Sequence, residues 1–100
     1  MRTEKKLEED ARGLASWLRA NAVSFAPLQI VRVDPSLDTD SEGEQFIRLT
    51  VVLEDPADSD EGWPLDATFR LYRAVREEVV EAEHGLAAYV HLQSVSDEAA

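Results

Sequence analysis

The sequence contains no cysteine, so disulfide bonds, thiolate metal sites and cysteine nucleophiles are excluded. No apolar run approaches the ~20 residues that span a bilayer, and the amino-terminal segment MRTEKKLEED is too charged for a secretory signal. The four glycines are isolated, so no glycine-rich loop is present to cradle a phosphate. We therefore expect a cytoplasmic protein with no membrane partner and no bound cofactor.

Basic residues are also scarce: 10 Lys and Arg stand against 21 Asp and Glu, for a net charge of −11. Nucleic acids and anionic membranes are bound by clustered Lys and Arg, so this balance disfavours both as direct partners. The charge complement of such a chain is a basic protein surface or a cation. Its 100 residues, 44% of them apolar, suffice for one small domain with a buried core.

The negative charge is concentrated around one apolar stretch, Phe46–Leu53. Between residues 33 and 69 there are eleven acidic residues and one basic residue, Arg48. Alternate residues from Ile47 onward are all apolar, which predicts a strand with one fully apolar face and a central place in its sheet. The acidic flanks have two interpretations: they keep the protein soluble, or they bind a basic partner.

The amino-terminal half predicts a helix followed by two antiparallel strands. Apolar residues at helical spacing indicate an amphipathic helix from about Glu4 to Asn21, with Asn21 in the left-handed position that ends it. The segment Leu28–Asp34 is rich in β-branched residues and stops at Pro35, which is typical of a strand. A polar connector then leads to Phe46–Leu53, and so short a connection favours antiparallel pairing.

The carboxyl-terminal half predicts a helix, a third strand and a frayed tail. Asp66 fits as the N-cap of a helix that runs to His84. Alternation over Ala88–Val95 predicts a strand, and residues 96–100 are expected to fray. A second, weaker stripe on the helix indicates a contact with the first helix or with another chain, and we expect the first helix. The stripe consists of Phe69, Arg73, Arg76 and Val80.

The predicted order is α-β-β-α-β in a single α+β domain over residues 1–100. A strand-helix-strand unit crosses over right-handed and makes its two strands parallel, so the three strands form a small mixed sheet with the two helices packed on one face. The opposite face is expected to be open or only partly covered, and an open face with some apolar content is a place for a partner. This face would carry Arg48, Thr50, His91, Phe46 and Val52.

This layout resembles that of minimal nucleotidyltransferases, which place a Gly-Ser turn before the second strand and a metal-binding D-x-D pair on it. Here no Gly-Ser turn follows Leu28–Asp34, and Phe46 and Arg48 stand where the paired Asp residues would be. The resemblance therefore implies a degenerate domain without the Mg²⁺ and nucleotide site. Similar layouts occur in KH-like and ferredoxin-like domains.

The motifs bear on two kinds of chemistry, cation binding and catalysis. Asp38, Asp40 and Glu42 alternate before a glycine, as the carboxylates that open an EF-hand calcium loop do, but Leu49 occupies the twelfth position, where a bidentate Glu is needed. A weak divalent-cation site at these three residues is an alternative. No catalytic residue is assigned, because neither His84 nor His91 has a serine and an acid at a defensible spacing.

The function predicted from these observations is protein binding through acidic loops, in the manner of an antitoxin, immunity protein, inhibitor or accessory subunit that engages a basic protein surface. Trp63 is expected either to pack over the start of the second helix or to protrude as an anchor. A homodimer through the open sheet face or an edge strand is a further alternative. The residues expected to contact the partner are Asp38, Asp40, Glu42, Glu44, Asp58, Asp60, Glu61 and Trp63.

Overall fold

A computed structural model describes residues 4–58, 60–82 and 85–99 of the chain. The predicted helix-strand-strand-helix-strand order is confirmed, with a short 3-10 helix and a short terminal helix in addition. The elements are α1 (Glu4–Ala20), η1 (Ala22–Phe25), β1 (Ile30–Thr39), β2 (Gln45–Leu53), α2 (Leu65–Glu81), β3 (Ala88–Ser94) and α3 (Val95–Ala99).

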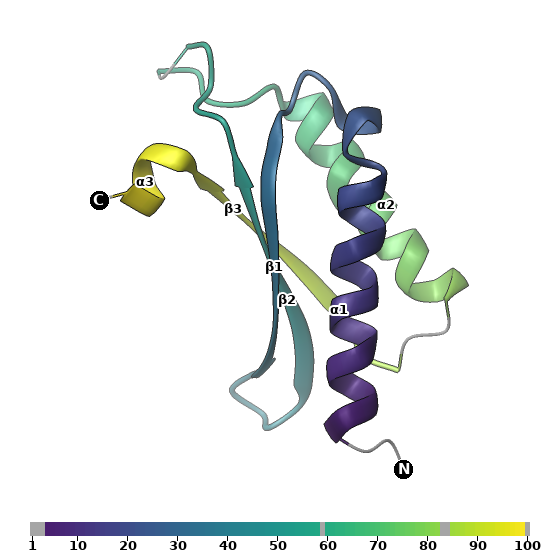
Figure 1. Ribbon diagram of the computed structural model, residues 1–100. Helices are drawn as coiled ribbons and strands as arrows, with labels where there is room; N and C mark the ends of the chain where they lie inside the picture. The colour runs from purple at the N-terminus through teal and green to yellow at the C-terminus, as the bar shows by residue number, and fades with distance from the viewer. Residues whose placement is uncertain (1–3, 59, 83–84, 100) are drawn as a thin grey trace.

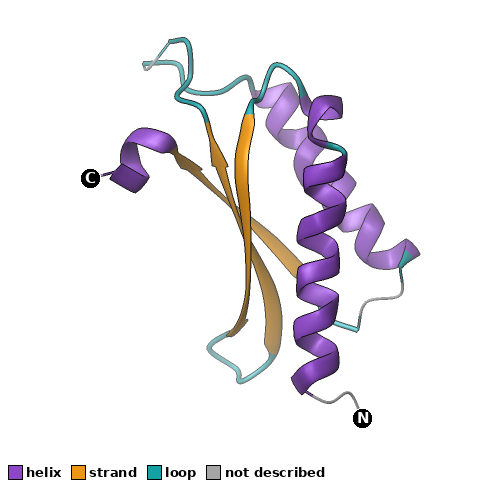
Figure 2. Cartoon of the chain, in the orientation of Figure 1, coloured by secondary structure: helices purple, strands orange, loops and turns teal. Residues whose placement is uncertain are grey.

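The three strands form one mixed sheet in the order β1-β2-β3. β2 is the central strand, as its apolar pattern predicted; it pairs antiparallel with β1 and parallel with β3. Figure 1 shows α1 and α2 together on one face of this sheet, and Figure 2 shows the same two layers as purple helices beside orange strands. The crossover through α2 thus sets β2 and β3 side by side.

The core lies between the helices and the apolar face of β2. The alternate residues Ile47, Leu49, Val51 and Leu53 are all fully buried. They pack with the apolar stripes of the two helices, and this one cluster includes Leu14, Leu18, Leu71 and Val75. Burying a side chain of this size contributes roughly 1.5–3 kcal/mol, so the period-two pattern of β2 fixes which face turns inward.

β1 runs through Pro35, where the sequence predicted its end. The strand continues to Thr39 and pairs with β2, with Pro35 opposite Leu49. The Asp40 N–H donates to the Glu44 carbonyl, so the backbone groups of Asp40 and of every second residue before it face β2. Residue 35 belongs to the other set, whose backbone groups point away from β2 to solvent. A proline is tolerated on an edge strand in this position, since the N–H that it lacks has no partner to lose.

Both long helices have ends that differ from the prediction. Asn21 has a φ of −105°, outside the left-handed region, and its Nδ2 donates to the Trp17 carbonyl at 2.8 Å. α2 begins directly after Pro64, so Asp66 lies in the first turn and is not the N-cap. Its negative charge there still complements the helix dipole. α2 ends at Glu81, and the predicted end at His84 lies outside the described residues.

The carboxyl-terminal segment that was expected to fray forms α3. Its Ser96 N–H and hydroxyl both donate to the Asp55 carboxylate, and the Asp97 N–H donates to the Ser94 hydroxyl. α3 contacts β2 and β3 and lies on the side of the sheet away from α1 and α2 (Figure 1). Val52, which the sequence placed on an open face, is fully buried there. The open face is therefore closed at this end.

The second stripe of α2 is solvent-exposed. The expected packing of this stripe on α1 is therefore wrong. Phe69 is 57% exposed and Val80 is 73% exposed. The reason is that α1 packs mainly over β1, whereas α2 lies toward β3.

Within the described part of the chain, no helix combines the length and the apolar character needed to cross a membrane.

Candidate protein-binding surface

The two acidic segments lie at opposite ends of β2. The β1–β2 hairpin loop, Asp40–Glu44, precedes this strand, and the loop of residues 54–64 follows it. Figure 1 shows them at the bottom and the top of the sheet. Eight residue steps along β2 correspond to roughly 27 Å, so one small contact patch reaches only one of the two ends. The predicted residues therefore divide into two groups of four.

In the hairpin loop, the Asp40 carboxylate holds the turn. Its Oδ1 accepts the backbone N–H groups of Glu42 and Glu44, each at 2.9 Å, and the turn closes through Gly43, whose φ is +86°. Asp40 is therefore a structural residue. Glu42 and Glu44 are exposed, and within the described residues their carboxylates have no partner, so these two are the charges that the loop presents to solvent.

The carboxylate of Asp38 leads from the hairpin onto the open face of the sheet. Its Oδ2 lies 3.0 Å from Arg48 Nη2, and the Arg48 guanidinium lies 5.6 Å from the centre of the Phe46 ring. Phe46 in turn meets Tyr89 of β3 edge to face, with ring centres 5.2 Å apart. We call these four residues the aromatic-acidic row. Tyr89 is 60% exposed, so the row begins at Asp38, next to the negatively charged hairpin loop, and ends in an accessible aromatic ring on β3.

The loop of residues 54–64, at the other end of β2, is stabilised by hydrogen bonds among its own residues. Asp58 Oδ1 accepts the backbone N–H of Asp60 at 3.0 Å and that of Glu61 at 3.4 Å. The Trp63 indole N–H donates to the Glu54 carbonyl at 2.9 Å, and the half-buried ring packs against the core. Of its four predicted contact residues, Asp60 and Glu61 are the ones whose side chains are left exposed and unengaged within the described residues.

Asp55, the second residue of this loop, has a shifted pKa. The hydroxyl and then the backbone N–H of Ser96 donate to its carboxylate and stabilise the charged form, which lowers the pKa of Asp55 below its ordinary value. The negative charge of Asp55 therefore joins α3 to the end of β2. This carboxylate already accepts two hydrogen bonds from within the chain.

Potential metal ligands are dispersed over the sheet. Asp34, Thr50 and His91 share one row of the open face, but Thr50 on the central strand separates the other two by two strand spacings, or about 9.6 Å. Across the described residues, no three His, Cys, Asp or Glu side chains gather as a metal site. The carboxylates of Asp38 and Asp40, proposed above for a cation, already hold Arg48 and the hairpin turn.

No protein-family model matches the chain, and no curated protein matches it significantly. Among solved structures, the fold is similar to a chain described as "Mode of Action of a Putative Zinc Transporter CzrB". The match covers 86% of this chain and 93% of that chain, with a TM-score of 0.55 and 17% sequence identity. An identity this low shows a common α+β fold and nothing about a shared activity.

The sequence correctly placed Phe46 on the second strand and Asp40, Glu42 and Glu44 in the connector before it, but it put Asp38 in that connector, whereas Asp38 lies on β1. It also missed Tyr89 as part of the site. The alternation of β3 could have found it, because Tyr89 falls on the same face as His91. What the sequence does not contain is the register that sets Tyr89 opposite Arg48. That register depends on the length of the crossover through α2.

Proposed function

We propose that this chain is a protein-binding domain that holds a basic partner surface against its hairpin end. The observation that carries the proposal is the aromatic-acidic row, which runs from Asp38, two residues before the hairpin loop with its exposed Glu42 and Glu44, to the exposed ring of Tyr89. Interface hot spots favour aromatic residues within a polar rim, and acidic groups around them speed association with a basic partner. Regulation of a basic enzyme in the cytoplasm, as by an inhibitor or accessory subunit, is the function that this fits.

The hairpin end is favoured over the loop of residues 54–64 for a structural reason. At the latter end, Trp63 is packed against the core and α3 lies against β2 and β3, and among the described residues this end of the sheet carries no exposed aromatic side chain. The sequence also predicted Asp58, Asp60, Glu61 and Trp63 as contact residues, but the contact proposed here does not include them. The partner proposed here contacts Glu42, Glu44, Asp38 and Tyr89.

The resemblance to the solved chain described with a zinc transporter raises zinc as a ligand. Protein zinc sites usually gather three or four nitrogen, sulfur or carboxylate ligands around the ion. The described residues of this chain do not fit that requirement, because no three such side chains come together. The proposal accordingly assigns zinc no role.

Retention of a partner from lysate of the host cell tests the proposal. A basic protein should be held at about 50 mM salt and released at about 500 mM, because screening weakens contacts between exposed charges. The double reversal Glu42→Lys with Glu44→Lys should abolish retention, and Tyr89→Ala should weaken it about tenfold.

The matched control reverses two charges at the opposite end, Asp60→Lys with Glu61→Lys. It changes the net charge equally and should leave retention at the wild-type level. Equal losses from the two double variants would show that only net charge matters and would overturn the assignment to the hairpin end. A lysate that yields no retained protein at low salt would overturn the protein-binding function itself.

A further inference from the structure

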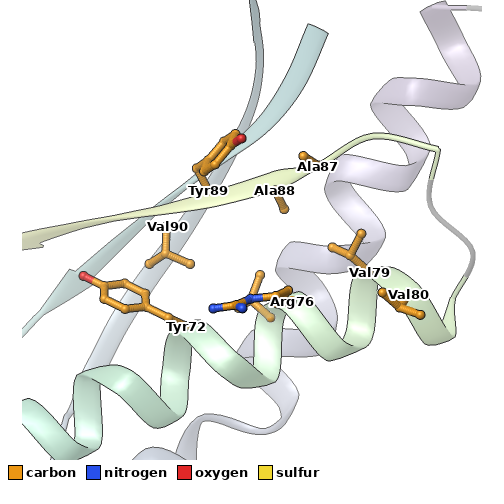
Figure 3. Close-up of a pocket in the computed structure, with 9 residues that line it drawn as sticks. Tyr72, Arg76, Val79, Val80, Ala87, Ala88, Tyr89 and Val90 are labelled. Carbon is orange, nitrogen blue, oxygen red and sulfur yellow. The ribbon is translucent and has the colours of Figure 1, made fainter. Parts of the chain in front are cut away.

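A cavity of about 630 Å³ opens between α2 and β3, on the helix-bearing face of the sheet, and Tyr89 of the aromatic-acidic row is among the residues at its border. Figure 3 shows Ala88 and Val90 of β3 pointing toward α2 across this space, whereas Tyr89 points away. Val79 and Val80 line it from the helix. The volume is in the range that accommodates several side chains or a small ligand, and its walls are mainly apolar.

One wall of the cavity is an unpaired sheet edge. β3 is the last strand of the sheet in the described chain, and the Ile47 N–H bonds the Ala87 carbonyl at 2.9 Å. The backbone groups of Ala87 and of every second residue after it therefore face β2, as alternation in a parallel ladder requires. Those of Ala88, Val90 and Leu92 face away from β2, at the free edge of the sheet. A row of outward N–H and C=O groups is a template for another strand.

The other wall continues as an apolar surface along α2. Tyr72 and Val80 border the cavity, and Phe69 and Leu65 extend the same helix face beyond it, all of them exposed. Contiguous exposed apolar residues of this kind mark an interaction surface when they are rimmed by polar groups. The rim here is basic. Arg76 lines the cavity, Arg73 is exposed one residue after Tyr72, and neither makes an ion pair or hydrogen bond within the described residues.

We infer that β3 and α2 accept an extended peptide segment of another protein as an added fourth strand. Its backbone pairs with Ala88, Val90 and Leu92, every second side chain enters the cavity, and a carboxylate on it meets Arg76. Strand addition of this kind draws affinity from the main chain and specificity from pockets for alternate side chains. Unpaired arginines beside an apolar groove select a peptide that is apolar and acidic.

A second copy of the chain fits this groove less well. Each copy carries a net charge of −11, so bringing two edges together opposes two like-charged molecules. A short peptide with one carboxylate brings the complementary charge without that repulsion.

The test uses a synthetic peptide of about eight residues, the length of an ordinary strand. Valine and one glutamate occupy alternate positions, and threonine occupies the others. Titration into the full chain, followed by amide NMR, should shift and protect from exchange the amides of Ala88, Val90 and Leu92. N-methylating one alternate set of peptide amides should abolish binding, while methylating the other set should leave it intact. Equal effects from both sets, or no binding, would overturn strand addition.

Charge is tested separately. Arg76→Glu should raise the Kd for this peptide about tenfold, and a peptide with lysine in place of glutamate should recover the lost affinity. The matched control, Arg12→Glu on the exposed face of α1, should leave the Kd unchanged. If the free protein sediments as a dimer that the peptide cannot dissociate, the occupant of the groove is a second copy and the inference is wrong.

Discussion

Asp55 links the terminal helix to the sheet through a charge. Because its pKa is lower in the folded chain than in the unfolded chain, its contribution to stability is present above the unfolded pKa and is lost as the pH falls through the folded one. We expect the urea midpoint of the wild type to fall as the pH drops below about 4, and Asp55→Asn to remove part of that fall. Urea unfolding between neutral and acidic pH measures both.

The control for Asp55 is Asp60→Asn, which removes the same charge from an exposed side chain of the same loop. Its acid dependence should match that of the wild type. Parallel curves for Asp55→Asn and the wild type would contradict the role of Asp55 in holding α3. A second readout is amide exchange at Ser96, which should quicken in Asp55→Asn because its acceptor is weakened.

Among the connecting elements, the hairpin depends on a left-handed glycine. A Cβ at Gly43 meets no atom within 4 Å, so Gly43→Ala acts through its φ of +86° alone and should destabilise the fold by about 1 kcal/mol. Gly13, in α1, also has open space around the added Cβ, and there Gly13→Ala should stabilise by about 0.5–1 kcal/mol. Chemical denaturation of the two variants should show changes of opposite sign in the free energy of unfolding for the same Gly→Ala substitution. The same sign at both positions would contradict the assigned turn.

The elements also show how far the sequence predicts this fold. The alternation in β2 predicted its central place and buried face, because a strand with one wholly apolar side has one low-energy orientation. Pro35 misled the prediction for β1, since whether a proline ends a strand depends on which side its missing N–H faces. α3 was missed because five residues have little intrinsic helicity, and its stability comes from Asp55, distant in the sequence. Contacts between remote residues decided both errors.

The whole molecule is elongated, measuring 46 × 28 × 20 Å, with its acidic loops at two ends of the sheet. The Debye length is about 8 Å at physiological ionic strength. The carboxylates at one end of the sheet therefore repel one another but have little effect on those at the other end. This separation is why charge reversal at the loop of residues 54–64 is a suitable control for reversal at the hairpin. It also implies that the net charge of −11 destabilises the fold locally at each end.

Screening should therefore stabilise the fold without any specific cation. We expect Tm to rise between about 20 mM and about 300 mM ionic strength, and CaCl₂ and MgCl₂ to raise it equally at matched concentration. The reason is that Asp38 and Asp40 already hold Arg48 and the hairpin turn, so calcium would have to displace contacts of the fold. A ligand that binds only the folded state raises Tm, and the rise grows with the logarithm of ligand concentration over Kd. An additional rise with calcium that disappears in Glu42→Gln would place a cation in the hairpin and contradict the protein-binding assignment of these carboxylates.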